Sequence, residues 1–122
     1  FPKYSGTTKI MRITKFDGHE NAQAYFIEDY GHGFQALQSY NTRVIESRYN
    51  VIRNALRHTI YGLYSMTTRK HIGWYAKAQG LAYSHFKWAY EHGCDILQDY
   101  TTGNIDFIHR ETGEILDTIK YH

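Results

Sequence analysis

Alternating apolar and polar residues predict strands in the first part of the chain. Residues 9–16, with the sequence KIMRITKF, alternate in this way and are rich in β-branched side chains, which favours a strand. The following DGHEN is typical of a turn, and AYFIEDY, residues 24–30, predicts a second short strand. Two glycines then flank His32, and their conformational freedom indicates another turn.

Residues 34–63 fit two different periods. Apolar residues recur at every third or fourth position, as on a helix face, at Ile45, Tyr49, Ile52, Leu56, Ile60 and Leu63. The same segment is rich in β-branched and aromatic residues, as strands are, and Gly62 disfavours one long helix. We therefore predict strands at residues 34–41, 43–49 and 56–64, with a helix over residues 43–63 as the alternative.

A helix is predicted after the pair Thr67 and Thr68. The positions that follow repeat at helical spacing on one face, and Gly80 stands where helices commonly stop. A threonine hydroxyl at such a junction accepts a hydrogen bond from an amide of the first turn, so we expect Thr67 or Thr68 to be the N-cap. The residues of the predicted face are Ile72, Tyr75, Ala76 and Gln79.

A second amphipathic segment occupies residues 81–93 and predicts another helix, which stops at its final glycine. The residues that share one face of it are Ala82, Phe86, Ala89 and Gly93. The chain closes with two β-rich runs in residues 105–121, where Gly113 supplies the positive φ of a hairpin turn. The sequence thus predicts the α+β class, as an antiparallel sheet with about two helices and a C-terminal hairpin.

Composition narrows the class of protein. A length of 122 residues matches a single globular domain, and 42% hydrophobic residues suffice for its core. Cys94 is the single cysteine, so no intramolecular disulfide forms and the reducing cytoplasm is the expected compartment. No apolar run approaches the roughly 18 residues of a membrane helix, and the first residues lack the apolar core of a signal peptide. We expect a cytoplasmic protein with no membrane partner.

The net charge of +2 hides two oppositely charged segments. Residues 43–77 carry seven basic groups and one acidic group, a sum of +6. Residues 91–122 carry two basic and seven acidic groups, a sum of −5. Such a separation either steers a partner to one face or lets the two segments pair within the fold.

We predict that a partner binds the basic segment. Arginine is informative because its planar donors suit phosphates and carboxylates and its flat face lies on aromatic rings. The candidate residues for binding a protein or a nucleic acid are Arg43, Arg48, Arg53, Arg57, Arg69 and Lys70. The alternative surface is the acidic tail around Asp95, Asp99 and Asp106.

A reactive centre is one interpretation of the segment YSMTTRKHI. Ser65 or Thr67 offers a nucleophile there, with Lys70 or His71 as a base. No third, orienting group accompanies them, so we expect the segment to be the start of a helix and the protein not to be an enzyme.

Histidines raise the question of a metal site. His85, His92 and Cys94 lie close together in the sequence, but they lack the ligand spacings that are typical of zinc sites. We therefore expect neither a bound metal nor a cofactor.

The aromatic content is compatible with nucleic-acid binding. Twelve tyrosines and two tryptophans are present, and aromatic faces beside arginines hold unstacked bases. Aromatic residues are equally typical of cores and protein interfaces. No Walker loop, GxGxxG or RNP-like segment occurs, so no specific nucleic-acid-binding motif supports this function. We therefore keep a nucleic-acid-binding accessory protein as the alternative function.

Two motifs give the chain a resemblance to known proteins. LQSYNTRV, residues 37–44, and YSMTTRKHI, residues 64–72, look like a family of short phage and plasmid proteins of uncharacterised function. Its members carry a Ser-Tyr-Asn-Thr strand and a Tyr-Ser-x-Thr-Thr-x-x-His junction between strand and helix. The resemblance implies a mobile-element product in a bacterial cytoplasm. We expect a non-catalytic accessory protein that binds a host protein or nucleoprotein, as an anti-CRISPR-like inhibitor of host defence.

Overall fold

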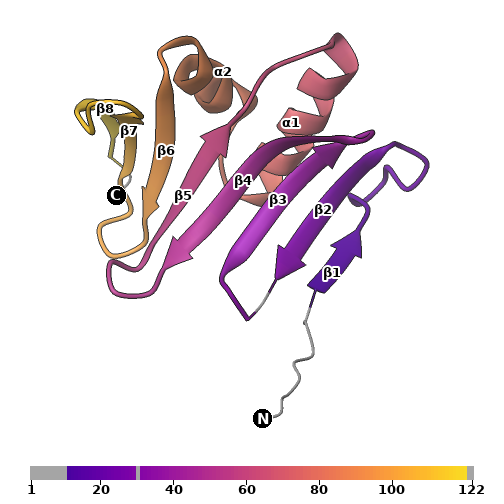
Figure 1. Cartoon of the computed structure of the whole chain (residues 1–122), viewed down its shortest axis with the longest axis horizontal. Helices are drawn as coiled ribbons and strands as arrows, with labels where there is room; N and C mark the ends of the chain where they lie inside the picture. Colours follow the sequence, from indigo (N-terminus) through magenta and orange to yellow (C-terminus); the bar gives the residue numbers. More distant parts are fainter. Residues whose placement is uncertain (1–10, 30, 121–122) are drawn as a thin grey trace.

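The computed structural model of the chain describes residues 11–29 and 31–120, which form a sheet of eight strands and two helices (Figure 1). The strands are β1 (Met11–Thr14), β2 (Ala24–Asp29), β3 (Phe34–Ser39), β4 (Thr42–Asn50), β5 (Ala55–Ile60), β6 (Cys94–Asp99), β7 (Ile105–His109) and β8 (Ile115–Ile119). They follow one another across the sheet in chain order, and neighbours are antiparallel. The helices that connect β5 to β6 are α1 (Met66–Ala78) and α2 (Tyr83–Glu91).

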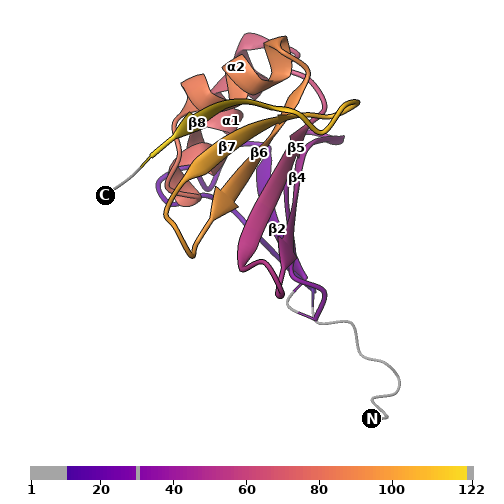
Figure 2. The ribbon, with the colours of Figure 1, turned by 90° about the vertical axis from the view of Figure 1, so that its left-hand side faces the viewer.

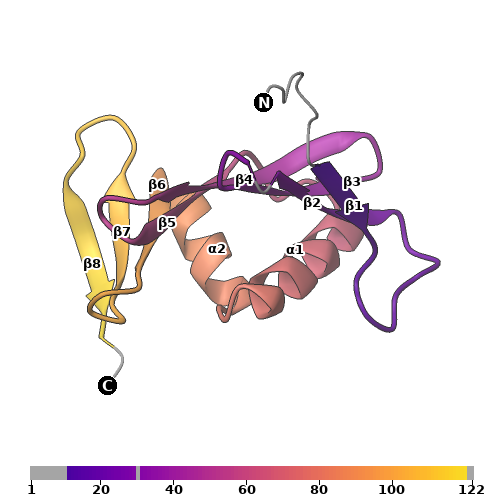
Figure 3. The ribbon, with the colours of Figure 1, turned by 90° about the horizontal axis from the view of Figure 1, so that it is seen from below.

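Both helices cover the same face of the sheet. Figures 2 and 3 show α1 and α2 on one side of the central strands, with the β7–β8 end turned steeply out of their plane. The other face of the central strands is left uncovered by the two described helices. An antiparallel sheet with two helices and a C-terminal hairpin confirms the predicted α+β class.

The core lies between the sheet and the helices. Leu37, Ile45 and Ile60 are cross-strand neighbours on β3, β4 and β5, and all three are fully buried. Tyr75 of α1 and Phe86 of α2 belong to the same buried cluster, with their ring centroids 6.4 Å apart. Burying each such apolar side chain contributes about 1.5–3 kcal/mol to stability, and this layer holds both helices on one face.

The predicted strands of the middle segment are confirmed as β3, β4 and β5. The alternative helix over residues 43–63 is wrong, because alternate side chains of this segment face the helices and the uncovered face. Strand β6 is absent from the predicted elements, since its run of buried residues shows no polar alternation. Residues 9, 10, 30 and 121, which the predicted strands included, lie outside the described residues.

Helix α1 begins at Met66, so the prediction of Thr67 or Thr68 as its N-cap is wrong. Ser65 is the N-cap: its backbone is extended, and its Oγ accepts a hydrogen bond from the Thr68 amide at 3.2 Å. Tyr64 precedes Ser65 and has a φ of 53°, which turns the chain after β5. The Ser65 side chain is therefore the one that reaches an unpaired amide of the first turn.

The predicted helix stops and hairpin turn are confirmed. Gly80 and Gly93 follow the two C-caps with φ of 76° and 68°, the left-handed conformation that favours glycine after a helix. Gly113, with φ of 76°, lies in the turn between β7 and β8.

The cap assignment predicts a difference between neighbouring hydroxyls. Ser65→Ala should lower the free energy of unfolding by about 1 kcal/mol, because an amide of the first turn loses its acceptor. Thr67→Ala is the matched control, since Thr67 is exposed on the first turn and should change stability little. Urea denaturation of both variants measures the difference, and a larger loss in Thr67→Ala would contradict the assignment.

Candidate functional site

Arginines gather on the sheet face that the helices leave uncovered. Ser47 and His58 point toward the helices, so their neighbours Arg48 and Arg57, which are cross-strand partners, point the other way. Phe34 of β3 pairs with Arg48, and the Arg48 guanidinium lies 4.7 Å from the centroid of its ring. We call this surface the arginine face; its residues are Phe34, Arg43, Glu46, Arg48, Arg57, Tyr61, Asp95 and Arg110.

Glu46 lies at one centre of the arginine face. Arg43 donates a hydrogen bond to its carboxylate at 3.1 Å, and Tyr61 donates its hydroxyl at 2.7 Å. The hydrogen bond to Glu46 is the main cause that raises the pKa of Tyr61. Arg48 lies 3.8 Å from the same carboxylate, so Glu46 is contacted by two guanidinium groups and one aromatic hydroxyl.

Asp95 lies at a second centre and is only 3% exposed. Arg57 donates from Nε to one oxygen at 2.8 Å, and Arg110 Nε lies 3.0 Å from the other in an ion pair. A buried carboxylate requires such partners, because an unpaired charge away from water is costly. The four arginines and two carboxylates of the arginine face sum to +2.

The structure brings together three of the six predicted binding residues, namely Arg43, Arg48 and Arg57. Arg53 lies in the turn between β4 and β5 and is exposed. Arg69 and Lys70 belong to α1, on the other side of the sheet, and do not converge with the rest. Half of the set thus shares one surface, and the binding role of these residues stays a prediction.

The carboxylates of the acidic tail also have partners within the fold. Asp95 pairs with Arg57, so the interpretation in which the two charged segments pair within the fold is confirmed for these residues. Asp99 accepts hydrogen bonds from the amides of the β6–β7 turn, and Asp106 accepts one from the Thr118 hydroxyl. Asp106 pairs with Leu97, which lies between Asp95 and Asp99 on β6, so the three carboxylates share one face of the sheet and the alternative acidic surface stays a prediction.

Three residues of the arginine face were not predicted from the sequence. Phe34 and Tyr61 were indistinguishable from core aromatics, and Arg110 lies within the acidic segment. Only the strand register shows that they meet Arg48, Glu46 and Asp95. No signal in the charge pattern identifies them.

The two motifs behind the family resemblance meet inside the structure. Ser39 Oγ lies 2.7 Å from Nδ1 of His71 and 3.2 Å from Oγ1 of Thr68. Ser65 donates its hydroxyl to the same Thr68 oxygen. Ser39, Thr68 and His71 are all buried, and loss of solvation is the main cause that lowers the pKa of His71.

This cluster joins a strand to a helix and differs from the nucleophile and base that the reactive-centre interpretation considered. The hydroxyl next to His71 belongs to Ser39, not to Ser65 or Thr67. Ser39 is 2% exposed, so its oxygen meets other protein atoms and not solvent. The arrangement supports a packing role for the YSMTTRKHI segment.

A second buried cluster surrounds His58, which is fully buried. Its Nδ1 lies 2.5 Å from Ser47 Oγ, and its Nε2 lies 2.6 Å from the Gln98 side-chain oxygen. Ser47 Oγ also lies 2.7 Å from the Tyr75 hydroxyl, which brings α1 into the cluster. Burial lowers the pKa of His58 from its ordinary value of 6.5 to about 4, so the ring is neutral at pH 7.

The residues considered for metal binding have other contacts. His85 accepts a hydrogen bond from the Ala82 amide, and His92 stacks on Trp88 with ring centroids 3.8 Å apart. Cys94 is buried and donates its thiol to the His92 carbonyl. Among the described residues, no group of three or more histidines, cysteines and carboxylates is arranged to hold a metal ion.

Comparison with known proteins leaves the family resemblance a prediction. No protein-family model, curated protein or solved structure matches the chain. In the part of the chain that the structure describes, neither helix has the length and hydrophobicity needed to cross a membrane.

The low pKa of His58 predicts that acid destabilises the protein. As the pH falls from 6.5 toward 4, the unfolded chain takes up a proton at this histidine before the folded one does. The stabilisation is therefore complete above pH 6.5, and a loss on the order of 3 kcal/mol should follow by pH 4.

Urea denaturation at several pH values measures this effect. His58→Gln is the control, because its amide keeps a donor and an acceptor at the site but does not titrate. The variant should show a smaller decrease in unfolding free energy between pH 6.5 and 4 than the wild type. Parallel decreases in the two proteins would show that His58 is not the cause.

Proposed function

We propose that this chain is a non-catalytic accessory protein of a phage or mobile element that binds a host protein or nucleoprotein through the arginine face. The proposal rests on one observation: four arginines from β4, β5 and the β7–β8 turn lie together beside Phe34 and Tyr61 on the uncovered sheet face. Arg48 has 69% of its side chain exposed, so it is the most accessible contact residue of the four.

The composition of the face favours a protein partner. Arginine and aromatic residues dominate the energetics of protein interfaces, where their flat groups fill pockets and pair with carboxylates. Glu46 and Asp95 alternate with the arginines and leave a small positive sum. A protein surface of mixed charge with a local excess of carboxylates complements this pattern better than a uniformly charged duplex does.

The resemblance of the two motifs supports the origin in a mobile element and the bacterial cytoplasm as the place of action. The arginine face gives this chain of 122 residues an exposed binding surface. Such a surface suits inhibition by binding, in which the protein blocks a host defence protein. Inhibition of the anti-CRISPR kind is the specific form of this proposal. Neither a cofactor nor a metal is part of it.

Binding of single-stranded nucleic acid is the second candidate. Two guanidinium groups, those of Arg43 and Arg48, lie within 5.7 Å of the Phe34 ring centroid. Such a combination of cation and aromatic ring stacks on unpaired bases. This candidate requires an affinity that falls steeply with salt, because bound phosphates release counterions.

A charge reversal on the arginine face tests the proposal. Arg48→Glu should weaken the partner about tenfold or more, or about 1.4 kcal/mol, because an exposed interface cation becomes an anion. The fold should persist, since exposed charges contribute little to stability. Tagged protein recovers the partner from host lysate, and titration with the purified partner then gives the affinity.

Arg53→Glu is the matched control, because it makes the same charge change in an exposed turn outside the arginine face. It should bind the partner with nearly the wild-type affinity. Equal affinities for wild type and Arg48→Glu, with intact thermal melting, would place the binding surface elsewhere. Recovery that nuclease treatment abolishes would favour the nucleic-acid candidate.

A further inference from the structure

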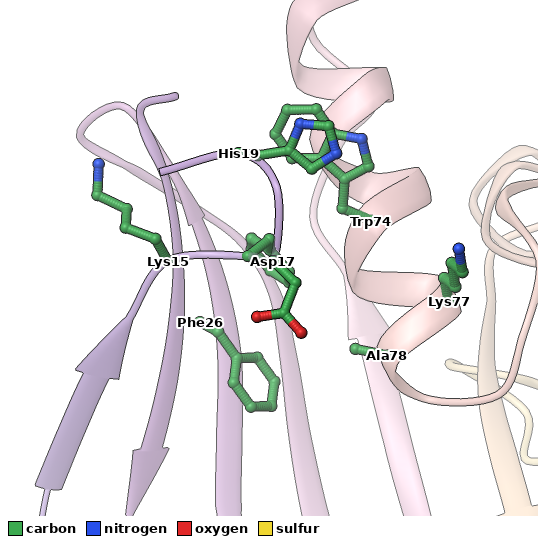
Figure 4. Close-up of a pocket in the computed structure, with 8 residues that line it drawn as sticks. Lys15, Asp17, His19, Phe26, Trp74, Lys77 and Ala78 are labelled. Carbon is green, nitrogen blue, oxygen red and sulfur yellow. The ribbon is translucent and has the colours of Figure 1, made fainter. Parts of the chain in front are cut away.

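A cleft of about 650 Å³ opens between α1 and the loop that follows β1 (Figure 4). Phe16, Phe26 and Trp74 form its apolar walls, and Asp17, His19 and Lys77 supply its polar groups. Its volume falls within the roughly 300–1,000 Å³ of small-molecule sites. Trp74 belongs to the helix layer, so the cleft is distinct from the arginine face and does not depend on the proposed function.

The aromatic walls are well packed against the core. The ring centroid of Phe16 lies 5.9 Å from that of Phe26 and 6.2 Å from that of Trp74. Lys15 donates hydrogen bonds to the carbonyls of Glu20 and Ala22, which hold the loop beside these rings. The apolar walls of the cleft are therefore held in place by contacts within the protein.

His19 shows what kind of group fits on Trp74. Its imidazole stacks on the indole with ring centroids 3.7 Å apart and an interplanar angle of 11°. His19 is exposed and comes from a turn, so a ligand reaches this position by displacing one surface side chain. The group that fits is a planar, nitrogen-containing aromatic ring.

Asp17 and Lys77 have groups to offer such a ligand. In the part of the chain that the structure describes, neither side chain has a hydrogen bond or an ion pair. Figure 4 shows the Asp17 carboxylate directed into the cleft, between Phe26 and Ala78. A carboxylate only accepts hydrogen bonds, so it selects a ring edge that carries two neighbouring N–H donors.

We propose that this cleft binds a guanine nucleotide. The guanine ring stacks on Trp74 in place of His19, and its N1–H and N2–H groups donate to Asp17. The phosphate lies at the mouth of the cleft near the Lys77 ammonium. Adenine is disfavoured, because its ring edge presents an acceptor nitrogen to the carboxylate beside a single donor group.

Calorimetric titration of the full chain with GMP, AMP and inorganic phosphate tests the proposal. GMP should bind about tenfold or more tightly than AMP, which is the discrimination that one two-pronged edge contact gives. Asp17→Ala should remove this preference by weakening GMP alone. Absence of GMP binding at millimolar concentration, or equal affinities for GMP and AMP, would overturn the proposal.

Two histidine variants test the stacking position. His19→Ala should tighten GMP binding severalfold, because the ring no longer has to displace the imidazole. His92→Ala is the matched control: it removes the equivalent histidine from Trp88, outside the cleft, and should leave GMP affinity unchanged. The proposal would also be overturned if His19→Ala melts like the wild type but binds GMP with unchanged or weaker affinity.

Discussion

The hydrogen bonds of His58 with Ser47 and Gln98 tie three neighbouring strands together inside the protein. They occur where β4, β5 and β6 pair, and a slip of one residue in either pairing would separate the partners. A slip would also exchange the buried and exposed sides of each strand. The buried cluster therefore decides which residues appear on the uncovered face, and it places Arg48 beside Arg57.

The same register also explains why two guanidinium groups of that face have fixed positions: each forms an ion pair with Asp95. Asp95 is buried, and a lone carboxylate at such a position would be strongly destabilising. Arg57 and Arg110 compensate it from β5 and from the turn after β7. Their guanidinium groups are held by these ion pairs, so binding of the proposed partner would cost less side-chain entropy.

Most of the fold was predictable because local signals agreed with the tertiary contacts. The glycines after both helices and the hairpin glycine marked the ends of elements correctly, and β-branched and aromatic content identified β3, β4 and β5. Strand β6 was missed because residues 94–98 are buried on both sides, which removes the alternation. The N-cap was misplaced because the left-handed turn at Tyr64 is not visible in a helix pattern.

The candidate site was predictable only as a charge excess. Counting charges found Arg43, Arg48 and Arg57, but it assigned Arg69 and Lys70 to the same surface, although they lie on a helix behind the sheet. A charge count does not use the strand and helix periods, so it does not tell which face a residue occupies. Phe34 and Arg110 show the converse, since remote residues become neighbours through strand pairing.

Cys94 gives this fold an intrinsic reporter of its motions. It is the single cysteine of the sequence, it begins β6, and it is fully buried. Burial is the main cause that raises the pKa of its thiol, so the reactive thiolate is scarce in the folded state. Thiol reagents thus modify the protein only when β6 opens away from α2, and the rate of that reaction measures local unfolding without an engineered label.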